Sequence, residues 1–223
     1  MKASLAVNAL IKYLLGLIFV GFLLFLPAGS FAFFNGWLFV LLLFVPMLIL
    51  GIILLIKSPD LLEKRLNSRE KEETQKGVVG FSALVFLLGF ILSGLDFRFG
   101  WSRIPSWLVC FGSILLLASY ALYAEVMREN AYLSRTIEVQ DGQKLVSTGL
   151  YGVVRHPMYS ATLLLFLSFA LVLGSFVTLL CFLLFVPLFI VRILNEEKVL
   201  GEGLDGYKDY CVKVKYRLFP FIW

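Results

Sequence analysis

Four long, uncharged and strongly apolar runs alternate with short charged segments along the chain, and they set its predicted architecture. The runs extend over residues 13–56, 77–95, 104–124 and 156–191. A helix that crosses a membrane needs about 20 predominantly apolar residues, so the first and last runs are each long enough for two spans. The pattern therefore predicts an all-α, polytopic membrane protein with about six transmembrane helices.

Turn-forming residues divide the two longest runs. The first run contains Pro27-Ala28-Gly29-Ser30, where proline and glycine disfavour a continuous helix. The last run has a weaker break at Gly174-Ser175, and one long tilted helix is the alternative there. Such a helix would exceed the length that tilting absorbs. We therefore expect a C-terminal helical hairpin, and six spans rather than five.

Composition and charge placement support this prediction and orient the chain. The sequence is 60% hydrophobic and only 16% charged, which is far too apolar for a soluble domain. With six spans, Lys2, Lys12, the basic residues of segment 57–76 and the basic C-terminus share one side, and Arg98 and Arg103 lie on the other. Lys and Arg accumulate in short cytoplasmic loops, so we expect both termini in the cytoplasm. The net charge of +5 suits anionic membrane lipids and does not indicate nucleic acid.

The chain is expected to have two parts. Residues 1–127 form a membrane-embedded four-helix half, with a cytoplasmic amphipathic segment at 57–76 whose leucines rest on the bilayer. Residues 128–223 carry the chemistry, with the transmembrane hairpin and a basic, aromatic C-terminus. The first apolar run leads straight into a second span, so we expect it to be retained rather than cleaved as a signal peptide.

Cysteine and histidine usage gives no indication of a metal site. The three cysteines lie far apart, at Cys110, Cys181 and Cys211, without the spacing of metal ligands. The single histidine, His156, precedes a proline that can begin a helix. We therefore expect neither a metal nor a disulfide framework.

Polar residues at both ends of the predicted hairpin form the candidate site. His156 and Arg192 lie equally far before and after Gly174, so the constant rise of a helix places them at one depth on neighbouring antiparallel helices. Glu196 follows Arg192 by about one turn, and Tyr159 follows His156. Ionisable groups at membrane depth usually face the protein interior or a wet cavity. The structural alternatives are an Arg–Glu pair that neutralises itself, or an arginine that snorkels to the interface.

These residues resemble the isoprenylcysteine carboxyl methyltransferases, with the related phospholipid methyltransferases close by. The matching segments, in order, are Leu145 to Tyr151, Arg155 to Tyr159, Arg192 with Glu196-Glu197, Gly206 to Tyr210, and Tyr216 to Trp223. The resemblance covers roughly the last hundred residues and is specific in order and spacing. The first four predicted spans match only in being hydrophobic.

The resemblance implies an S-adenosylmethionine site under a cytoplasmic cap, with a lipidic or prenylated substrate that enters from the bilayer. Arg192 would face the substrate, and Arg192, Glu196 and His156 would be the catalytic residues. The family often has a histidine where this chain has Gln143. The residues that would contact the cofactor are Thr136, Gln143, Lys144, Leu145, Val146, Tyr151, His156, Pro157, Met158, Tyr159 and Glu196.

The chemistry of these side chains agrees with methyl transfer. Glu196 suits a cationic sulfonium, Tyr151 and Tyr159 offer aromatic faces, and Arg192 suits a carboxylate. A carboxylate nucleophile needs no general base, so alignment supplies most of the catalysis. An amine would have to lose a proton, which makes His156 or Glu196 the candidate acceptor.

We therefore expect a membrane methyltransferase that carries out carboxyl O-methylation of a lipidic or prenylated substrate. Three alternatives stay open: a phospholipid amine N-methyltransferase, a sterol-type NADPH membrane reductase, and a non-catalytic membrane sensor. The chain lacks the glycine-rich dinucleotide fingerprint, which is weak evidence against the reductase because membrane reductases need not use that fold.

Overall fold

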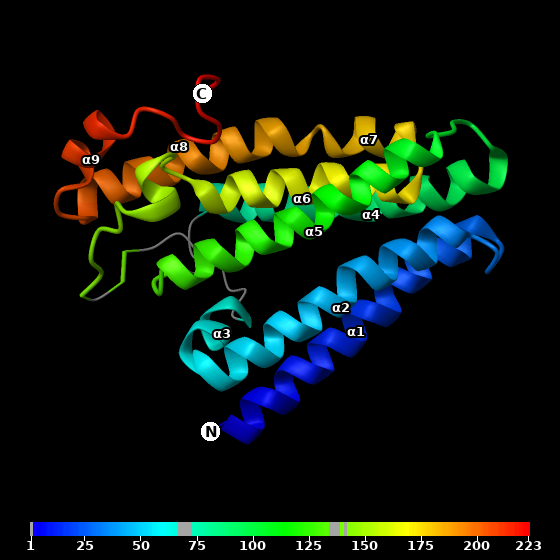
Figure 1. Ribbon diagram of the computed structural model, residues 1–223, viewed down its shortest axis with the longest axis horizontal. Coiled ribbons are helices and arrows are strands. Elements are labelled where there is room, and N and C mark those ends of the chain that lie inside the picture. Colours follow the sequence, from blue (N-terminus) through cyan, green and yellow to red (C-terminus); the bar gives the residue numbers. More distant parts are fainter. Residues whose placement is uncertain (1, 67–72, 134–138, 141) are drawn as a thin grey trace.

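A computed structural model describes residues 2–66, 73–133, 139–140 and 142–223, and this part of the chain is helical without strands (Figure 1). Three long helices and a short one come first: α1 (Lys2–Ala28), α2 (Phe34–Lys57), α3 (Pro59–Leu66) and α4 (Glu73–Phe99). The second part comprises α5 (Ser106–Glu129), the 3-10 turn η1 (Gly149–Gly152), α6 (Pro157–Leu173), α7 (Phe176–Phe182), α8 (Phe185–Gly203) and α9 (Tyr207–Lys213). The predicted all-α class is confirmed for the described residues.

Five segments of the described chain are long and apolar enough to cross a membrane. They are Ser4–Ala28, Phe34–Lys57, Lys76–Phe99, Ser106–Glu129 and Phe176–Gly203, the last of which combines α7 and α8. Helix α6 is apolar but shorter, and it is buried along most of its length between its neighbours. A multi-pass membrane protein therefore follows from the fold, whereas the count of six spans and the orientation of the termini stay predictions.

Both predicted breaks in the apolar runs occur, and a third was missed. Helix α1 ends at Ala28, and Gly29 follows with a φ of 63°. Gly174 ends α6 in the left-handed region with a φ of 78°, and the Ser175 hydroxyl caps α7 by accepting a hydrogen bond from Thr178 N. The missed break separates α7 from α8. Pro187 lies in the first turn of α8, where its missing N–H is tolerated.

Close helix contacts hold the bundle together. A side chain at Gly89 would overlap the Phe182 ring, so α4 and α7 can pack this closely only because residue 89 is a glycine. Gly112 of α5 approaches Leu171 of α6 in the same way. Small residues at such contacts let membrane helices come close enough for extensive van der Waals packing. Fully buried phenylalanines, among them Phe39, fill the remaining space.

Hydrogen bonds to a buried carboxylate connect the helices at the end of the bundle opposite to α3 and α9. Asp96 of α4 is 2% exposed, and its carboxylate accepts hydrogen bonds from Ser102 N at 2.7 Å and from the Ser102 hydroxyl at 2.5 Å. The Ser175 hydroxyl donates to the same carboxylate at 2.5 Å. Asp96 thus ties the α4–α5 connection to the turn between α6 and α7.

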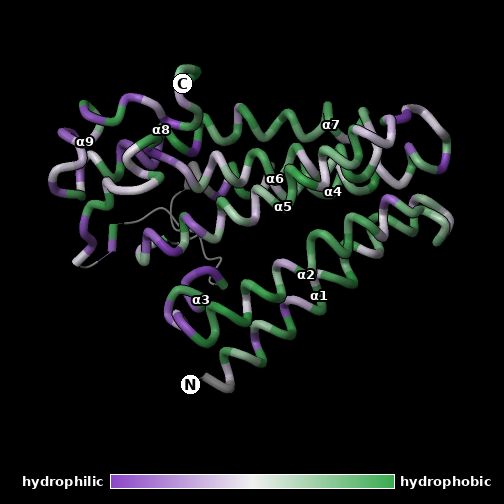
Figure 2. Tube along the Cα trace, viewed as in Figure 1, coloured by the Kyte–Doolittle hydropathy of each residue, from purple (hydrophilic) through white to green (hydrophobic). Residues whose placement is uncertain are grey.

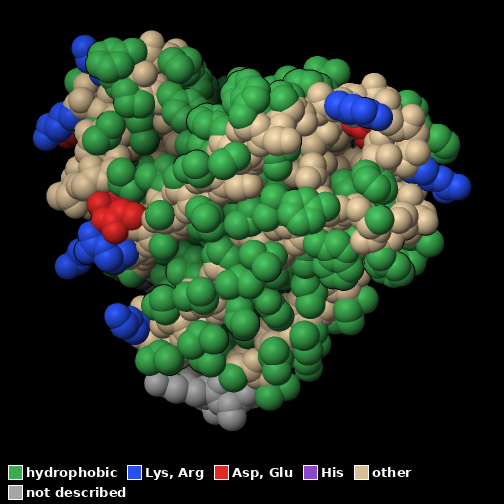
Figure 3. Space-filling view, turned by 45° about the vertical axis from the view of Figure 1, so that its right-hand side comes forward, with side chains coloured by type: hydrophobic (Ala, Val, Ile, Leu, Met, Phe, Trp, Pro, Cys, Tyr) green, Lys and Arg blue, Asp and Glu red, His purple; other side chains and the backbone are tan. Residues whose placement is uncertain are grey.

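The outer surface is mostly apolar, as a protein embedded in lipid requires. Hydrophobic side chains cover the face shown in Figure 3, and charged groups are confined to its borders. The polar part of the chain gathers around α3, α9 and the end of α8 (Figure 2). Exposed aromatic side chains at the other end, such as Trp101 and Trp107, suit a membrane–water interface.

The predicted amphipathic segment at 57–76 differs from expectation in detail. Leu61 and Leu62 of α3 are buried against the protein instead of resting on the bilayer, because α3 folds back onto α1 and α2. Lys12 Nζ donates to Leu66 O at 2.8 Å and holds the end of α3. The last residues of the segment, from position 73 on, belong to α4.

Candidate functional site

His156 occupies the N-cap position of α6, and its buried imidazole faces α8. Pro157 follows at the first helical position, where a proline begins a helix without losing a hydrogen bond. The imidazole Nε2 lies 3.2 Å from Oε1 of Glu197. His156 is 4% exposed, so burial fixes the imidazole in this contact.

Glu197 gathers three cationic or ionisable groups around one carboxylate. Besides His156, Arg155 Nε lies 3.1 Å from Oε1, and Arg217 Nε donates to Oε2 at 2.9 Å. The Glu197 side chain is 13% exposed and Arg155 8%, so these charges are mostly withdrawn from water. Removing the Glu197 carboxylate would be costly, because the arginines would lose the negative charge that compensates them.

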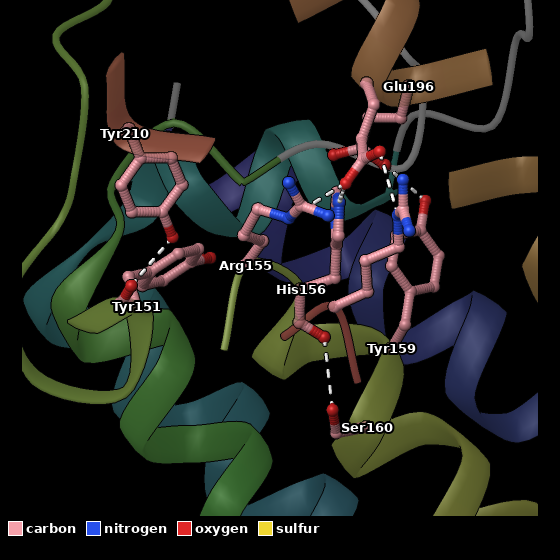
Figure 4. A network of polar contacts seen from close by, with 9 residues as sticks. Tyr151, Arg155, His156, Tyr159, Ser160, Glu196 and Tyr210 are labelled. Atoms are coloured by element: carbon pink, nitrogen blue, oxygen red, sulfur yellow. Dashed lines mark hydrogen bonds and ion pairs between the residues drawn. The ribbon is translucent and has the colours of Figure 1, made fainter. Parts of the chain in front are cut away.

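One turn into α6, Tyr159 connects the two other residues that the sequence singles out. Its hydroxyl donates to Glu196 Oε2 at 2.5 Å and accepts from Arg192 Nε at 2.9 Å. Figure 4 shows Glu196 reaching from α8 toward Tyr159. The expected Arg–Glu neighbourhood on α8 is therefore bridged by a phenol from α6, and the hairpin brings His156, Tyr159, Arg192 and Glu196 to one level.

The C-terminal segment packs against the start of α6. Arg155 N donates to Tyr216 O and His156 N to Arg217 O, both at 2.9 Å. The Ser160 hydroxyl donates to Leu218 O at 2.5 Å. These bonds give an irregular segment a defined path and place the Arg217 guanidinium on Glu197.

Tyr151, on the side of the candidate site that faces α9, is held by contacts with two other segments. Its hydroxyl accepts from Asn130 Nδ2 at 3.0 Å, and Tyr210 of α9 donates to its backbone oxygen at 2.7 Å (Figure 4). Burial raises the pKa of the Tyr151 phenol, so the side chain stays neutral. The Glu129 carboxylate accepts from Leu150 N at 2.9 Å and secures the 3-10 turn.

Residues 143–146, which precede η1, make contacts of their own in the structure. Gln143 Oε1 accepts from Gln140 N at 2.9 Å, so this amide closes its own turn. Lys144 is exposed, and Leu145 packs against Tyr207 and Tyr210. Val146 is half-buried, as is Met158, whereas Pro157 is buried. Thr136 lies outside the described residues.

Sequence reasoning missed the cluster around Glu197. Arg155 and Glu197 stand beside the residues that it selected, but nothing in the sequence indicates that the Arg217 guanidinium returns to them. Asn195 was also passed over, although its Nδ2 is buried and has no hydrogen-bond partner within the described part of the chain. A buried amide without a hydrogen-bond partner, beside Glu196 in the sequence, suggests that a ligand provides the missing acceptor. Burial of this amide could not be predicted from the sequence.

Comparison with known proteins gives a family match in the second half of the chain. Residues 107–204 match the family model of the phospholipid methyltransferases. That family belongs to the same superfamily of membrane methyltransferases as the isoprenylcysteine carboxyl methyltransferases. The matched range includes Tyr151, His156, Tyr159, Arg192 and Glu196, and it supports a membrane methyltransferase.

A second similarity points to a different enzyme. The chain is 32% identical over 91 residues to Delta(14)-sterol reductase TM7SF2 of Mus musculus. This alignment covers 40% of the chain and 22% of the reductase, so the chain spans about a fifth of the length of that relative.

Proposed function

We propose that the protein is an S-adenosylmethionine-dependent methyltransferase that acts on a lipidic or prenylated substrate. The observation that carries the proposal is the Tyr159 hydroxyl, which joins Arg192 and Glu196 inside the range that matches the methyltransferase family. A candidate substrate-binding cation and a candidate cofactor-binding anion are thereby held side by side. The apolar outer surface supports delivery of the substrate through the bilayer.

The donors and acceptors present fit the proposed cofactor. Glu196 Oε2 accepts a hydrogen bond from Tyr159, and the carboxylate provides a negative charge that suits a cationic sulfonium. The buried Asn195 amide needs an acceptor. Tyr151 and Tyr159 supply aromatic faces that attract cations. S-adenosylmethionine, when bound, supplies an electrophilic methyl group on a sulfonium centre.

We propose carboxyl O-methylation as the reaction. Arg192 would hold a substrate carboxylate and orient one oxygen toward the methyl group, while Tyr159 fixes Arg192 through the bond to Nε. The carboxylate oxygen gains the methyl group and becomes a neutral ester, so no proton has to leave. This suits the state of His156, whose Nε2 is engaged by Glu197 and is a poor candidate for a general base.

A phospholipid amine N-methyltransferase is the second candidate, because the matched family model is that of the phospholipid methyltransferases. Glu196 would then accept the proton of the amine. A sterol-type NADPH reductase is favoured only by the partial similarity to the mouse enzyme. A non-catalytic membrane sensor would retain the same contacts without turnover.

The proposal includes the placement of the chain in the membrane. Six spans follow if α6 crosses together with α5 and α8, and both termini then lie in the cytoplasm with most of the basic residues. Residues 1–127 would form the membrane-embedded scaffold, and residues 128–223 the catalytic part. The C-terminal segment that packs on Arg155 and His156 would form the cytoplasmic cap.

Cofactor binding separates the methyltransferase from the reductase. The full chain, purified in detergent, is titrated with S-adenosylmethionine and separately with NADPH, and heat release is recorded. We expect saturable binding of S-adenosylmethionine, weakened at least tenfold in Glu196→Gln, since a hydrogen bond to a charged group contributes about 1.5–3 kcal/mol. Glu202→Gln, an exposed position on the same helix, is the matched control. Saturable binding of NADPH alone would overturn the proposal.

A further inference from the structure

A cavity of about 530 Å³ opens beside the last turns of α8 and the start of α9. Its walls include Arg155, Glu197, Lys198, Glu202, Tyr207 and Lys208. Tyr159 and Glu196, which we assign to the methyl-transfer site, do not line it. The cavity therefore lies across α8 from that site, and the proposed reaction does not account for it.

The wall of this cavity contains a buried hydroxyl without a partner. Tyr207 is 4% exposed, and among the described residues its Oη has no hydrogen-bond partner. A buried hydroxyl left unpaired costs free energy, and native proteins seldom retain one unless something else satisfies it. Because Tyr207 lines the cavity, a ligand with an acceptor oxygen would supply the missing partner.

Arg155 brings donors to the same wall. Its Nε forms the ion pair with Glu197, but within the described part of the chain this nitrogen makes no hydrogen bond. The Nε–H group is thus a buried donor that Glu197 attracts by charge but does not satisfy by a hydrogen bond. A planar guanidinium that is fixed by a neighbouring carboxylate is well suited to the oxygens of a phosphate.

The balance of charge selects an anion. Arg155, Lys198 and Lys208 line the cavity together with two carboxylates, those of Glu197 and Glu202. Glu197 is also held by His156 and Arg217, so its charge is largely compensated within its own cluster. The cavity therefore has an excess of positive charge, which favours a ligand with one or two negative charges.

We propose that this cavity binds a phosphate group, through hydrogen bonds from the Tyr207 hydroxyl and the Arg155 guanidinium and through the charges of Lys198 and Lys208. The phosphate of an anionic lipid head group and free phosphate share this chemistry. The site is separate from methyl transfer, although both adjoin α8. It does not depend on the function proposed above.

Tyr207→Phe is the most informative variant, because it removes only the hydroxyl, which makes no hydrogen bond to any of the described residues. The full chain in detergent is heated in rising concentrations of inorganic phosphate, with sodium chloride at matched ionic strength as the reference. We expect phosphate to raise the melting temperature of the native chain above the chloride reference. In Tyr207→Phe the half-saturating phosphate concentration should rise about tenfold, while stability without phosphate is unchanged or higher.

Lysine variants of α9 provide the matched control. Lys208→Gln should weaken the phosphate effect severalfold, whereas Lys213→Gln, on the same helix but outside the cavity, should leave it as in the native chain. Equal stabilisation by phosphate and chloride would contradict the proposal, and so would an unchanged phosphate response in Tyr207→Phe.

Lipid nanodiscs distinguish the two sources of the phosphate. Discs of phosphatidylcholine with and without phosphatidic acid are compared by the melting temperature of the native chain and of Tyr207→Phe. Stabilisation by phosphatidic acid that is lost in Tyr207→Phe would identify a lipid head group. A response to inorganic phosphate alone would identify the free anion. If neither source stabilises the native chain beyond its reference, the cavity is not a phosphate site.

Discussion

The hydroxyl of Tyr159 donates a hydrogen bond of 2.5 Å to Oε2 of Glu196, and so connects α6 with α8 at the level of the proposed site. The same oxygen accepts from Arg192 Nε at 2.9 Å. One phenol thereby positions a candidate cofactor ligand and a candidate substrate ligand at the same time.

Tyr159→Phe tests this double role. The ring remains, so its packing on Phe189 is preserved, but Arg192 and Glu196 lose their common partner. We expect methyl transfer to fall by about 10- to 100-fold, as is typical when a positioning group is lost. Initial rates with labelled cofactor, together with an unfolding curve, measure the effect. Tyr13→Phe, which likewise removes one phenol hydroxyl but on α1, is the control. A native rate in Tyr159→Phe would exclude the positioning role.

The Glu197 cluster is predicted to be a major source of stability. Glu197→Gln removes the charge that compensates Arg155 and Arg217, and we expect it to lower the free energy of unfolding by about 2–4 kcal/mol. Chemical denaturation in detergent measures this loss. Glu202→Gln, exposed on the same helix, should cost less than about 0.5 kcal/mol. Equal effects of the two substitutions would mean that the cluster contributes little.

Alanine substitutions at two glycines with positive φ distinguish the cost of backbone strain from the cost of a steric clash. Gly142 has a φ of 70° and open space around it, whereas a side chain at Gly149, with a φ of 56°, would overlap the Glu129 carboxylate. Gly142→Ala should therefore cost about 1 kcal/mol from strain alone. Gly149→Ala should cost at least about 2 kcal/mol more, because Glu129 must leave Leu150 N.

Thermal unfolding of the two alanine variants, measured side by side with the native chain, gives the comparison. Equal destabilisation would show that Glu129 does not fix the 3-10 turn that carries Tyr151.

Alkaline pH should destabilise the region around Tyr151 and Tyr210. Burial raises the pKa of both phenols above the ordinary value of about 10. Above that pH the unfolded chain loses these protons while the folded chain keeps them, so stability falls as pH rises. Unfolding curves between pH 8 and about 11.5 measure the loss. Tyr210→Phe should flatten the decline, although it lowers stability at pH 8 by about 1 kcal/mol through the lost bond to Tyr151 O.

The sequence predicted which polar side chains of the hairpin lie near one another, because helical geometry determines their depth. Equal distances from Gly174 placed His156 and Arg192 at one depth, and the regular rise of a helix makes such an inference reliable. The partner of His156 was not predictable in this way, because Glu196 and Glu197 are adjacent and only packing decides which carboxylate faces which tyrosine or histidine.

The features that were missed lie where periodicity is absent. Arg217 reaches Glu197 because backbone hydrogen bonds attach residues 216 and 217 to the start of α6, and no repeating pattern marks that contact. The break between α7 and α8 depends on Pro187 inside an apolar run. Hydrophobicity alone gives no sign of it, since the run on both sides of the break, from Phe176 to Val191, is uncharged and apolar.

Transfer of a labelled methyl group into lipid tests the central claim most directly. The full chain and Glu196→Gln are incubated with S-adenosylmethionine labelled in its methyl group and a membrane lipid extract, and the organic phase is counted before and after mild alkali. We predict label in the organic phase that depends on Glu196 and is released by alkali as methanol, as a methyl ester requires. Label that alkali moves into the aqueous phase without producing volatile methanol would identify N-methylation instead, because alkali removes the acyl chains of a phospholipid but leaves an N-methyl group in place. No transfer by the native chain, while it oxidises NADPH with a sterol, would contradict the methyltransferase account.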